Sequence, residues 1–276
     1  TPVNDPPNFT LATSWTTRES NRAWDSVSSS ADGSKLVAVV RGGRIYTSSD
    51  SGKNWTARMT DMNRDWESVA SSENGSKLAA VVYGGQIYIS TDSGETRRAR
   101  MIDMNRNWTS VASSADGAKL VAVIDAGNIY TSTNSGETWT ARMTDMNRPW
   151  FSVASSADGS KLVAADVRTF TGQDFEGGHI YTSINSGETW MPRMTDKNRF
   201  WWSVASSADG SKLVAVDRGG YIYASTDSGA TWMEQTSAGM QEWYSVASSA
   251  DGANLVAVVR LFAKSLCGKS EVLTCT

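Results

Sequence analysis

One polar cluster recurs along the chain and has the chemistry to bind a polyhydroxylated ligand. Within residues 58–66 an aspartate, an asparagine and an arginine precede a tryptophan, and the pattern returns three more times. Carboxylates and amides exchange hydrogen bonds with vicinal hydroxyls, and a guanidinium donates a planar pair. The cluster therefore predicts carbohydrate binding. Its candidate residues are Asp61, Asn63, Arg64, Asp103, Asn105, Arg106, Asp145, Asn147, Arg148, Asp196, Asn198 and Arg199.

Further candidates come from less regular positions. A shortened copy supplies Asn21 and Arg22, and two turns nearby supply Arg41 and Arg218, whereas residues 237–243 hold neither the Asn-Arg pair nor the aspartate. A structural alternative stays open, in which these groups cap the loop and bridge its neighbours while the tryptophan is buried. Repetition alone cannot separate the two interpretations, because a duplicated segment retains structural and binding residues alike.

The elements that position these clusters are repeats of about 42 residues, one of them about nine residues longer. Each opens with W-x-S-V-(A/S)-S-S and continues through an A-D-G-S-K turn, L-V-A-V-V, a Gly-Gly turn and I-Y-T-S-T. The opening tryptophans are Trp24, Trp66, Trp108, Trp150, Trp201 and Trp243. Repeats of this length with four short strand-like segments indicate the blades of a β-propeller.

The first repeat shows how a blade is predicted. Residues 24–30, 35–40, 44–49 and 54–59 read as strands, separated by turns in which Asp-Gly and Gly-Gly tolerate positive φ. No segment has helical periodicity, which excludes a βαβ architecture. We therefore expect an all-β fold, a single six-bladed propeller over residues 1–276, with four antiparallel strands in each blade.

The two ends of the chain predict closure of the ring. Residues 271–276 align with a third strand, and residues 9–18 resemble an orphan fourth strand that would pair with it. The only two cysteines, Cys267 and Cys275, lie close together near this seam and predict one disulfide. A disulfide, together with a start at Thr1 and not at Met, favours a secreted, extracellular protein.

The third turn of the repeats carries S-x-D-x-G-x-x-W five times, at residues 48–55, 90–97, 132–139, 183–190 and 225–232. With these copies the chain resembles the Asp-box (BNR-repeat) propellers, a group that includes sialidases, photosystem II assembly factors and secreted lectin-like proteins. Asn134 and Asn185 depart from the motif, as does Arg97, which replaces the tryptophan. The resemblance implies a structural role, in bracing the hairpin and packing between strands, for Asp50, Trp55, Asp92, Trp139, Trp190, Asp227 and Trp232.

Strand alternation predicts which face of the disc would bind. The Asp-boxes share one face with the A-D-G-S turns, while the polar clusters share the other with the turns between second and third strands. An extended loop at residues 166–178 falls on this second face, followed by the only histidine, His179. It would gate the central opening, contact a partner or be a tolerated insertion.

Three function classes follow, and we expect a non-catalytic, multivalent lectin-like protein that binds glycans or an anionic polysaccharide. The alternative is a protein-binding scaffold with an arginine-lined face. A sialidase-like glycosidase is less favoured, because most Arg, Asp and Tyr residues repeat; its candidate acids would be Asp166, Asp174, Glu176, Asp217 and Glu242. The net charge of −3 and the lack of long apolar runs predict neither nucleic-acid binding nor a membrane span, and we expect no cofactor or metal.

Overall fold

The computed structural model describes residues 16–145, 147–167, 169–170, 175–176, 178–260 and 272–275. Apart from one short 3₁₀ helix, η1 (Thr236–Ala238), the regular elements in this part of the chain are strands. The first blade contains β1 (Trp24–Ser29), β2 (Leu36–Val40), β3 (Ile45–Ser48) and β4 (Thr56–Arg58), hydrogen-bonded antiparallel in that order. These bounds match the predicted strands to within a few residues.

Four more sheets repeat this order. The second blade is β5 (Trp66–Ser71), β6 (Leu78–Val82), β7 (Ile87–Ser90) and β8 (Arg98–Arg100), and the third is β9 (Trp108–Ser113), β10 (Leu120–Ile124), β11 (Ile129–Ser132) and β12 (Thr140–Arg142). The fourth is β13 (Trp150–Ser155), β14 (Leu162–Asp166), β17 (Ile180–Ser183) and β18 (Met191–Arg193), and the fifth is β19 (Trp201–Ser206), β20 (Leu213–Asp217), β21 (Ile222–Ser225) and β22 (Met233–Gln235). The sixth is β23 (Trp243–Ser248), β24 (Leu255–Val259) and β25 (Val272–Cys275).

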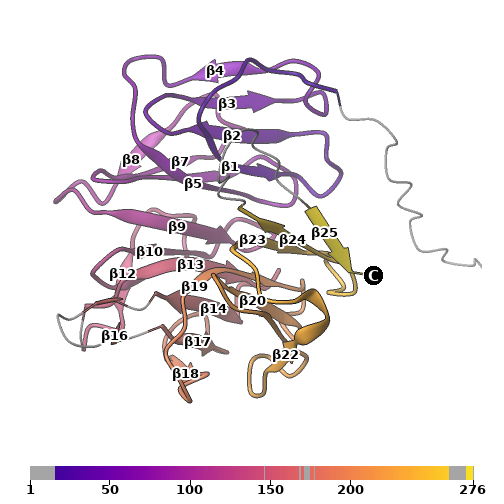
Figure 1. Cartoon of the computed structure of the whole chain (residues 1–276). Helices are drawn as coiled ribbons and strands as arrows, with labels where there is room; N and C mark the ends of the chain where they lie inside the picture. Colours follow the sequence, from indigo (N-terminus) through magenta and orange to yellow (C-terminus); the bar gives the residue numbers. More distant parts are fainter. Residues whose placement is uncertain are drawn as a thin grey trace, which may run out of the picture.

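The blades follow one another in chain order around the molecule (Figure 1). The first strand of each blade packs against the first strand of the next, from β1 through β5, β9, β13 and β19 to β23. These strands therefore lie innermost, around the axis. The six sheets, with no α-helix between them in the described residues, confirm the propeller fold.

Backbone hydrogen bonds join successive blades near the axis. Ala31 N donates to Glu73 O and Glu73 N to Ala115 O, both at 2.7 Å, and the series continues through Ala157 and Ala208 to Ala250. Serine side chains of the first strands form a second set, in which Ser26 Oγ accepts from the backbone N–H of the next blade at 3.2 Å. The small residues of W-x-S-V-A-S-S thus permit close approach of neighbouring backbones.

The core lies between blades. Trp66, Trp108, Trp150, Trp201 and Trp243 have no exposed surface. Trp66 packs with Val37 and Val39 of the preceding blade, so each repeat buries its tryptophan against its neighbour.

The predicted closure of the ring is not found. The sixth sheet has three strands, residues 16–18 are not in a strand, and residues 9–15 lie outside the described residues. Trp24 is 38% exposed and Val27 68%, whereas the equivalent Trp66 and Val69 are 0% and 5% exposed. The reason is that no described blade packs against β1 from the side opposite β5. The third-strand position predicted for the C-terminal segment is confirmed by β25, which pairs with β24.

Two other expectations fall partly outside the described residues. Within the predicted 166–178 loop, β15 (Thr169–Phe170) pairs with β16 (Phe175–Glu176), but Arg168, residues 171–174 and Gly177 are not described. Cys267 is not described either, nor is the side chain of Cys275, so the predicted disulfide stays a prediction.

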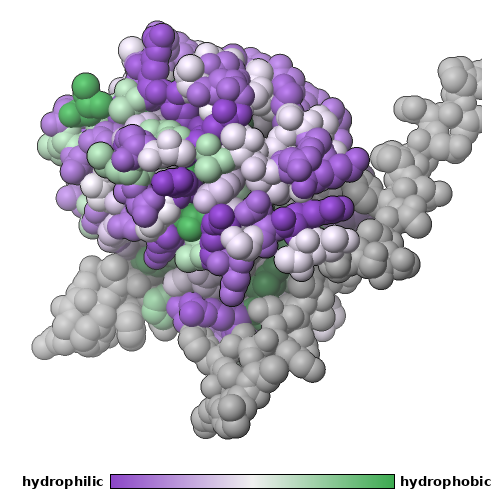
Figure 2. Space-filling model, turned by 90° about the horizontal axis from the view of Figure 1, so that it is seen from above, coloured by the Kyte–Doolittle hydropathy of each residue, from purple (hydrophilic) through white to green (hydrophobic). Residues whose placement is uncertain are grey.

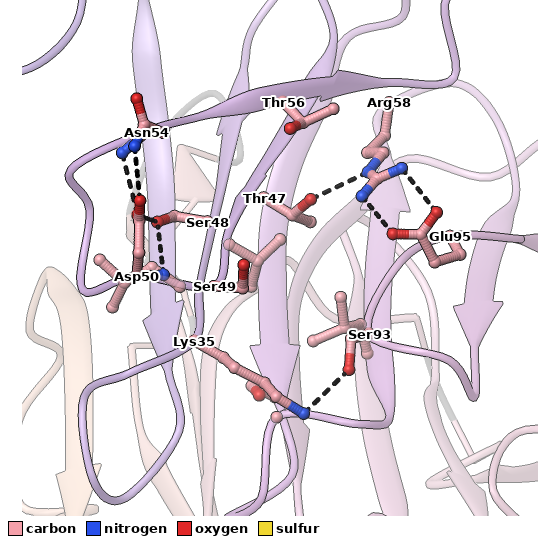
Figure 3. A pocket seen from close by; sticks show the side chains of 15 residues that line it. Lys35, Thr47, Ser48, Ser49, Asp50, Asn54, Thr56, Arg58, Ser93 and Glu95 are labelled. Carbon is pink, nitrogen blue, oxygen red and sulfur yellow. Dashed lines mark hydrogen bonds and ion pairs between the residues drawn. The ribbon is translucent and has the colours of Figure 1, made fainter.

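The Asp-box turns are closed by their own side chains (Figure 3). Asp50 accepts hydrogen bonds from Ser48 Oγ at 2.8 Å and from the backbone N–H of Asn54 at 2.9 Å, and Trp55 Nε1 donates to Gly52 O at 3.1 Å. The hydrogen bonds from Asn54 and Ser48 lower the pKa of Asp50 to about 2. The same surface carries inter-blade contacts, in which Arg58 binds Glu95 and Lys35 Nζ donates to Ser93 Oγ, so its polar groups are engaged in folding.

Candidate functional site

The predicted binding residues lie in the connections between blades, here called the junction loops and defined as residues 59–65, 101–107, 143–149 and 194–200. Backbone bridges join each of the first two loops to the turn between the second and third strands, as in Gly43 with Arg64 and Gly85 with Arg106. Both hydrogen bonds of the first bridge are close to 3 Å. The loops and the turns therefore share one face, as predicted from strand alternation.

The arginine of a junction loop is engaged on all sides. Arg64 donates to both carboxylate oxygens of Asp61, at 3.1 and 2.7 Å, and its Nε donates to the Tyr88 hydroxyl at 3.1 Å. Its guanidinium lies 5.1 Å from the centre of the Tyr88 ring. A bidentate ion pair with a stacked aromatic ring fixes the loop in one conformation.

The backbone conformation at the start of the junction loops is also repeated. Met59, Met101, Met143 and Met194 begin the four loops with φ between 49° and 55°, a left-handed conformation that methionine seldom adopts. Such a conformation persists only where surrounding contacts impose it. The loops are thus preorganised and alike.

The ion pair recurs in all four loops. Arg106, Arg148 and Arg199 pair with the aspartate three residues before them, at 2.6 to 2.8 Å, and the arginine side chains are only 4% to 11% exposed. The aspartates are 57% to 60% exposed. The hydrogen bond from the arginine lowers the pKa of Asp61, Asp103 and Asp196 to about 2.

The surface of each loop is formed by aspartate and asparagine together with apolar side chains. Asn63, Asn105, Asn147 and Asn198 are exposed. Asn105 Oδ1 accepts a hydrogen bond from Gln86 Nε2 at 2.8 Å. Met62 and Met104 are about 60% exposed beside them. Figure 2 shows the described surface from above as mainly hydrophilic, with small separate hydrophobic areas.

Two junctions depart from this pattern, as the sequence predicts. Before the first blade, Arg22 pairs with Glu19 at 2.8 Å and lies 4.7 Å from the centre of the Tyr46 ring, beside the exposed Asn21. Before the sixth blade, η1 and Gln241 replace the loop, and Gln241 bridges to Gly220.

The candidate arginines of the turns are also paired. Arg41 lies between two carboxylates, 3.3 Å from Asp25 and 2.5 Å from Glu67, and Arg218 Nε donates to Glu242 at 2.9 Å. Asp25 and Glu67 are not among the residues predicted from the sequence. The available signal was their position directly after the repeated tryptophan, where each blade has a different residue.

The unrepeated acids do not form a catalytic pair in the described structure. Asp166 is buried and accepts from the backbone N–H of His179, while Asp217 accepts from that of Phe200 at 2.9 Å, so each braces its own blade. Asp174 and the side chain of Glu176 are not described.

Among the described residues, no three His, Cys, Asp or Glu side chains are grouped as a metal site. In the same part of the chain, no helix has the length and hydrophobicity that a membrane crossing requires.

No family model and no curated protein matches the chain, but many solved structures share its fold. A GH74 enzyme from Niastella koreensis is 16% identical with a TM-score of 0.71, over 86% of this chain and 44% of its own. A GH74 xyloglucanase from Xanthomonas campestris is 14% identical with a TM-score of 0.66, over 86% and 44%. YCF48 from Cyanidioschyzon merolae is 16% identical with a TM-score of 0.65, over 87% of this chain and 80% of its own.

These similarities confirm the resemblance to the propeller group at the level of the fold. The chain spans less than half the length of the two GH74 enzymes. Because the neighbours include both glycoside hydrolases and YCF48, the shared fold leaves the function open.

Proposed function

We propose that this protein is a secreted, non-catalytic propeller that binds carbohydrate through its junction loops. The observation that carries the proposal is the fourfold recurrence of one preorganised site, in which a buried arginine fixes an exposed aspartate next to an exposed asparagine. An enzyme needs one unique cluster, whereas a multivalent binder can use equivalent sites. The repetition therefore favours binding over catalysis.

The chemistry of each loop supports a sugar as its ligand. Asp103 accepts hydrogen bonds, Asn105 donates and accepts them, and Met104 offers an apolar surface. The arginine supports the site from below the loop surface, because its hydrogen-bond donors are taken up by the aspartate. Single sites of this kind bind weakly, but a polymer that contacts several at once gains affinity through effective concentration. One similar structure is a xyloglucanase, which is consistent with a polysaccharide ligand.

A protein-binding scaffold is the second candidate, because the junction face also exposes large apolar side chains. Met62, Ile102, Met104 and Met240 are 59% to 72% exposed. Apolar side chains surrounded by polar groups are common at protein interfaces. A glycosidase is less favoured, since Asp166 and Asp217 each accept a backbone hydrogen bond and Glu242 pairs with Arg218 of the preceding blade.

A glycan array, followed by calorimetry with a polysaccharide that binds, tests the proposal. We compare Asn105→Ala with a variant in which all four loop asparagines are alanine. The single change should weaken polymer binding severalfold and the fourfold change by about 100-fold or more, because multivalent affinity falls steeply as sites are lost. The control is Met233→Ala, which changes an exposed side chain on β22 of the outer edge.

Retained folding of each variant is checked by thermal unfolding. A blank array would contradict carbohydrate binding and favour the scaffold. Equal binding by the fourfold variant would move the site away from the junction loops.

A further inference from the structure

The position that follows each repeated tryptophan differs in every blade, although its neighbours hardly vary. The six residues are Asp25, Glu67, Thr109, Phe151, Trp202 and Tyr244. In all six blades the pairing of first and second strands shifts at this residue, so each occupies a β-bulge. A bulge re-aims its side chain and often lies beside a binding site. The fold requires the bulge but not a particular side chain in it. The variation of this side chain between blades therefore needs another explanation.

These residues surround the axis, since they belong to the innermost strands. The last residues of the second strands lead into a matching set of turns, in which Arg41, Arg218 and Arg260 each donate a backbone N–H to the residue before the tryptophan. The six bulge residues with these three arginines are here called the axial mouth. It lies at the end of the propeller that also carries the junction loops.

One half of the axial mouth is aromatic. Phe151 and Trp202 have ring centres 4.2 Å apart, and Trp202 and Tyr244 have ring centres 5.7 Å apart, so three successive blades form one continuous shelf. Arg218 lies 4.6 Å from the centre of the Trp202 ring, and Arg260 lies 5.6 Å from that of Tyr244. Tyr244 is 41% exposed. The shelf therefore offers an apolar surface bordered by charged groups.

The other half is acidic and is bridged by Arg41, which contacts both Asp25 and Glu67. The acidic half belongs to the first two blades and the aromatic half to the fourth, fifth and sixth, so the two halves lie around the same axis. Arg41 and Arg218 lie beside the carboxylates of Asp25, Glu67 and Glu242, and Asp125 occupies the turn position of the third blade that Arg41 occupies in the first. This mixture of hydrogen-bond donors and acceptors suits an uncharged ligand with hydroxyl groups.

We propose that the axial mouth is a second carbohydrate site, which holds one neutral sugar ring against Tyr244 between its acidic and aromatic halves. A pyranose has an apolar face for the aromatic shelf and hydroxyls for the carboxylates and guanidinium groups. This inference rests on the proposed function, but it places a single unrepeated site on the axis in addition to the equivalent sites around it.

Burial and the nearby Asp25 raise the pKa of Glu67 to about 7, with Asp65 adding to the rise and Arg41 opposing it. The ionised carboxylate accepts stronger hydrogen bonds from hydroxyls than the protonated acid does. Sugar affinity at the axial mouth should therefore increase as the pH rises through about 7.

The test uses methyl pyranosides and neutral disaccharides, which are too short to span several junction loops, with binding followed by NMR titration of the full chain. Tyr244→Ala should weaken this binding about tenfold or more, whereas Met233→Ala, an exposed residue outside both proposed sites, should leave it unchanged. Glu67→Gln should remove the pH dependence near 7.

The outcomes separate this inference from the proposed function. If Tyr244→Ala binds short sugars as the wild type does, or if short sugars do not bind while a polysaccharide binds through the loop asparagines, the axial site is wrong and the junction sites remain. If short sugars require Tyr244 while the fourfold asparagine variant still binds polymer normally, the axial site is supported and the junction sites fail. No binding of any sugar overturns both.

Discussion

The first and second blades share one sequence pattern but differ in exposure. Trp66 begins the second blade and is fully buried, whereas Trp24, at the same position of the first, is 38% exposed. Both pack on the tyrosine of their own third strand, with ring centres 5.2 to 5.3 Å apart. The difference is that Trp66 has a preceding blade and Trp24 has none in the described structure. In a repeat protein, burial is thus a property of the interface between units and not of the unit alone.

The largest effect should come from truncating the tryptophan in these two settings. Trp108→Ala removes a fully buried ring between two blades and should reduce the free energy of unfolding by about 3–5 kcal/mol. Trp24→Ala, in a site with one open side, should cost about 1–2 kcal/mol. Urea unfolding of both variants measures the difference. Equal losses would show that Trp24 is covered in solution and that the ring closes.

A smaller effect should distinguish the arginines of complete and shortened junctions. Arg106→Met removes a guanidinium whose side chain is 10% exposed, together with its bonds to Asp103 and to the carbonyls of Met101 and Met104, so we expect a loss of about 2 kcal/mol. Arg22→Met changes a side chain that is 29% exposed and should cost less than about 1 kcal/mol. Thermal unfolding of the two variants checks this order. A reversed order would mean that the junction pair contributes little to folding.

The Asp-box of the second blade offers a stabilising change. Arg97 replaces the tryptophan of the other boxes, and its Nη1 donates to Gly94 O at 3.1 Å, as Trp55 Nε1 does to Gly52 O. Its Nη2 is buried without a partner, and burial lowers its pKa to about 10. Arg97→Trp should therefore stabilise the protein by about 1 kcal/mol in urea unfolding. The reverse change, Trp139→Arg, should destabilise it; stabilisation by the reverse change would contradict this account.

The smallest expected effect is on the pH dependence of stability. It compares Glu67 with Thr109, which occupy equivalent bulges in neighbouring blades. Because the folded state raises the pKa of Glu67 from 4.5 to about 7, folding favours its protonated form. The stability of the wild type should fall as the pH rises from about 4.5 to about 7, by less than about 1 kcal/mol after screening by water. Glu67→Gln should remove this slope, whereas Thr109→Ala should retain it. Unfolding at pH 5 and pH 8 provides the measurement.

Sequence periodicity predicted the strands and turns well, because alternating apolar residues and Gly-containing turns are local signals. The exposed first blade could not be predicted, since it depends on whether two distant ends of the chain meet. The role of Arg64 was also undetermined, because sequence does not show that Asp61 and Tyr88 take up its donors. Glu67 had a visible signal, its variable position after a constant tryptophan, but only the structure brings it to Arg41.

The chain of short backbone bonds from Ala31 through Glu73 and Ala115 to Ala250 has a beginning and an end. A closed ring would have neither, and every blade in it would be equally braced. In an open arc, fraying can start at either terminal blade and advance inward one unit at a time. Amide hydrogens of β10 and β14 should then exchange most slowly with solvent, and those of β2 and β24 fastest, so that an exchange gradient along the chain reports the open side that β1 has in the described structure.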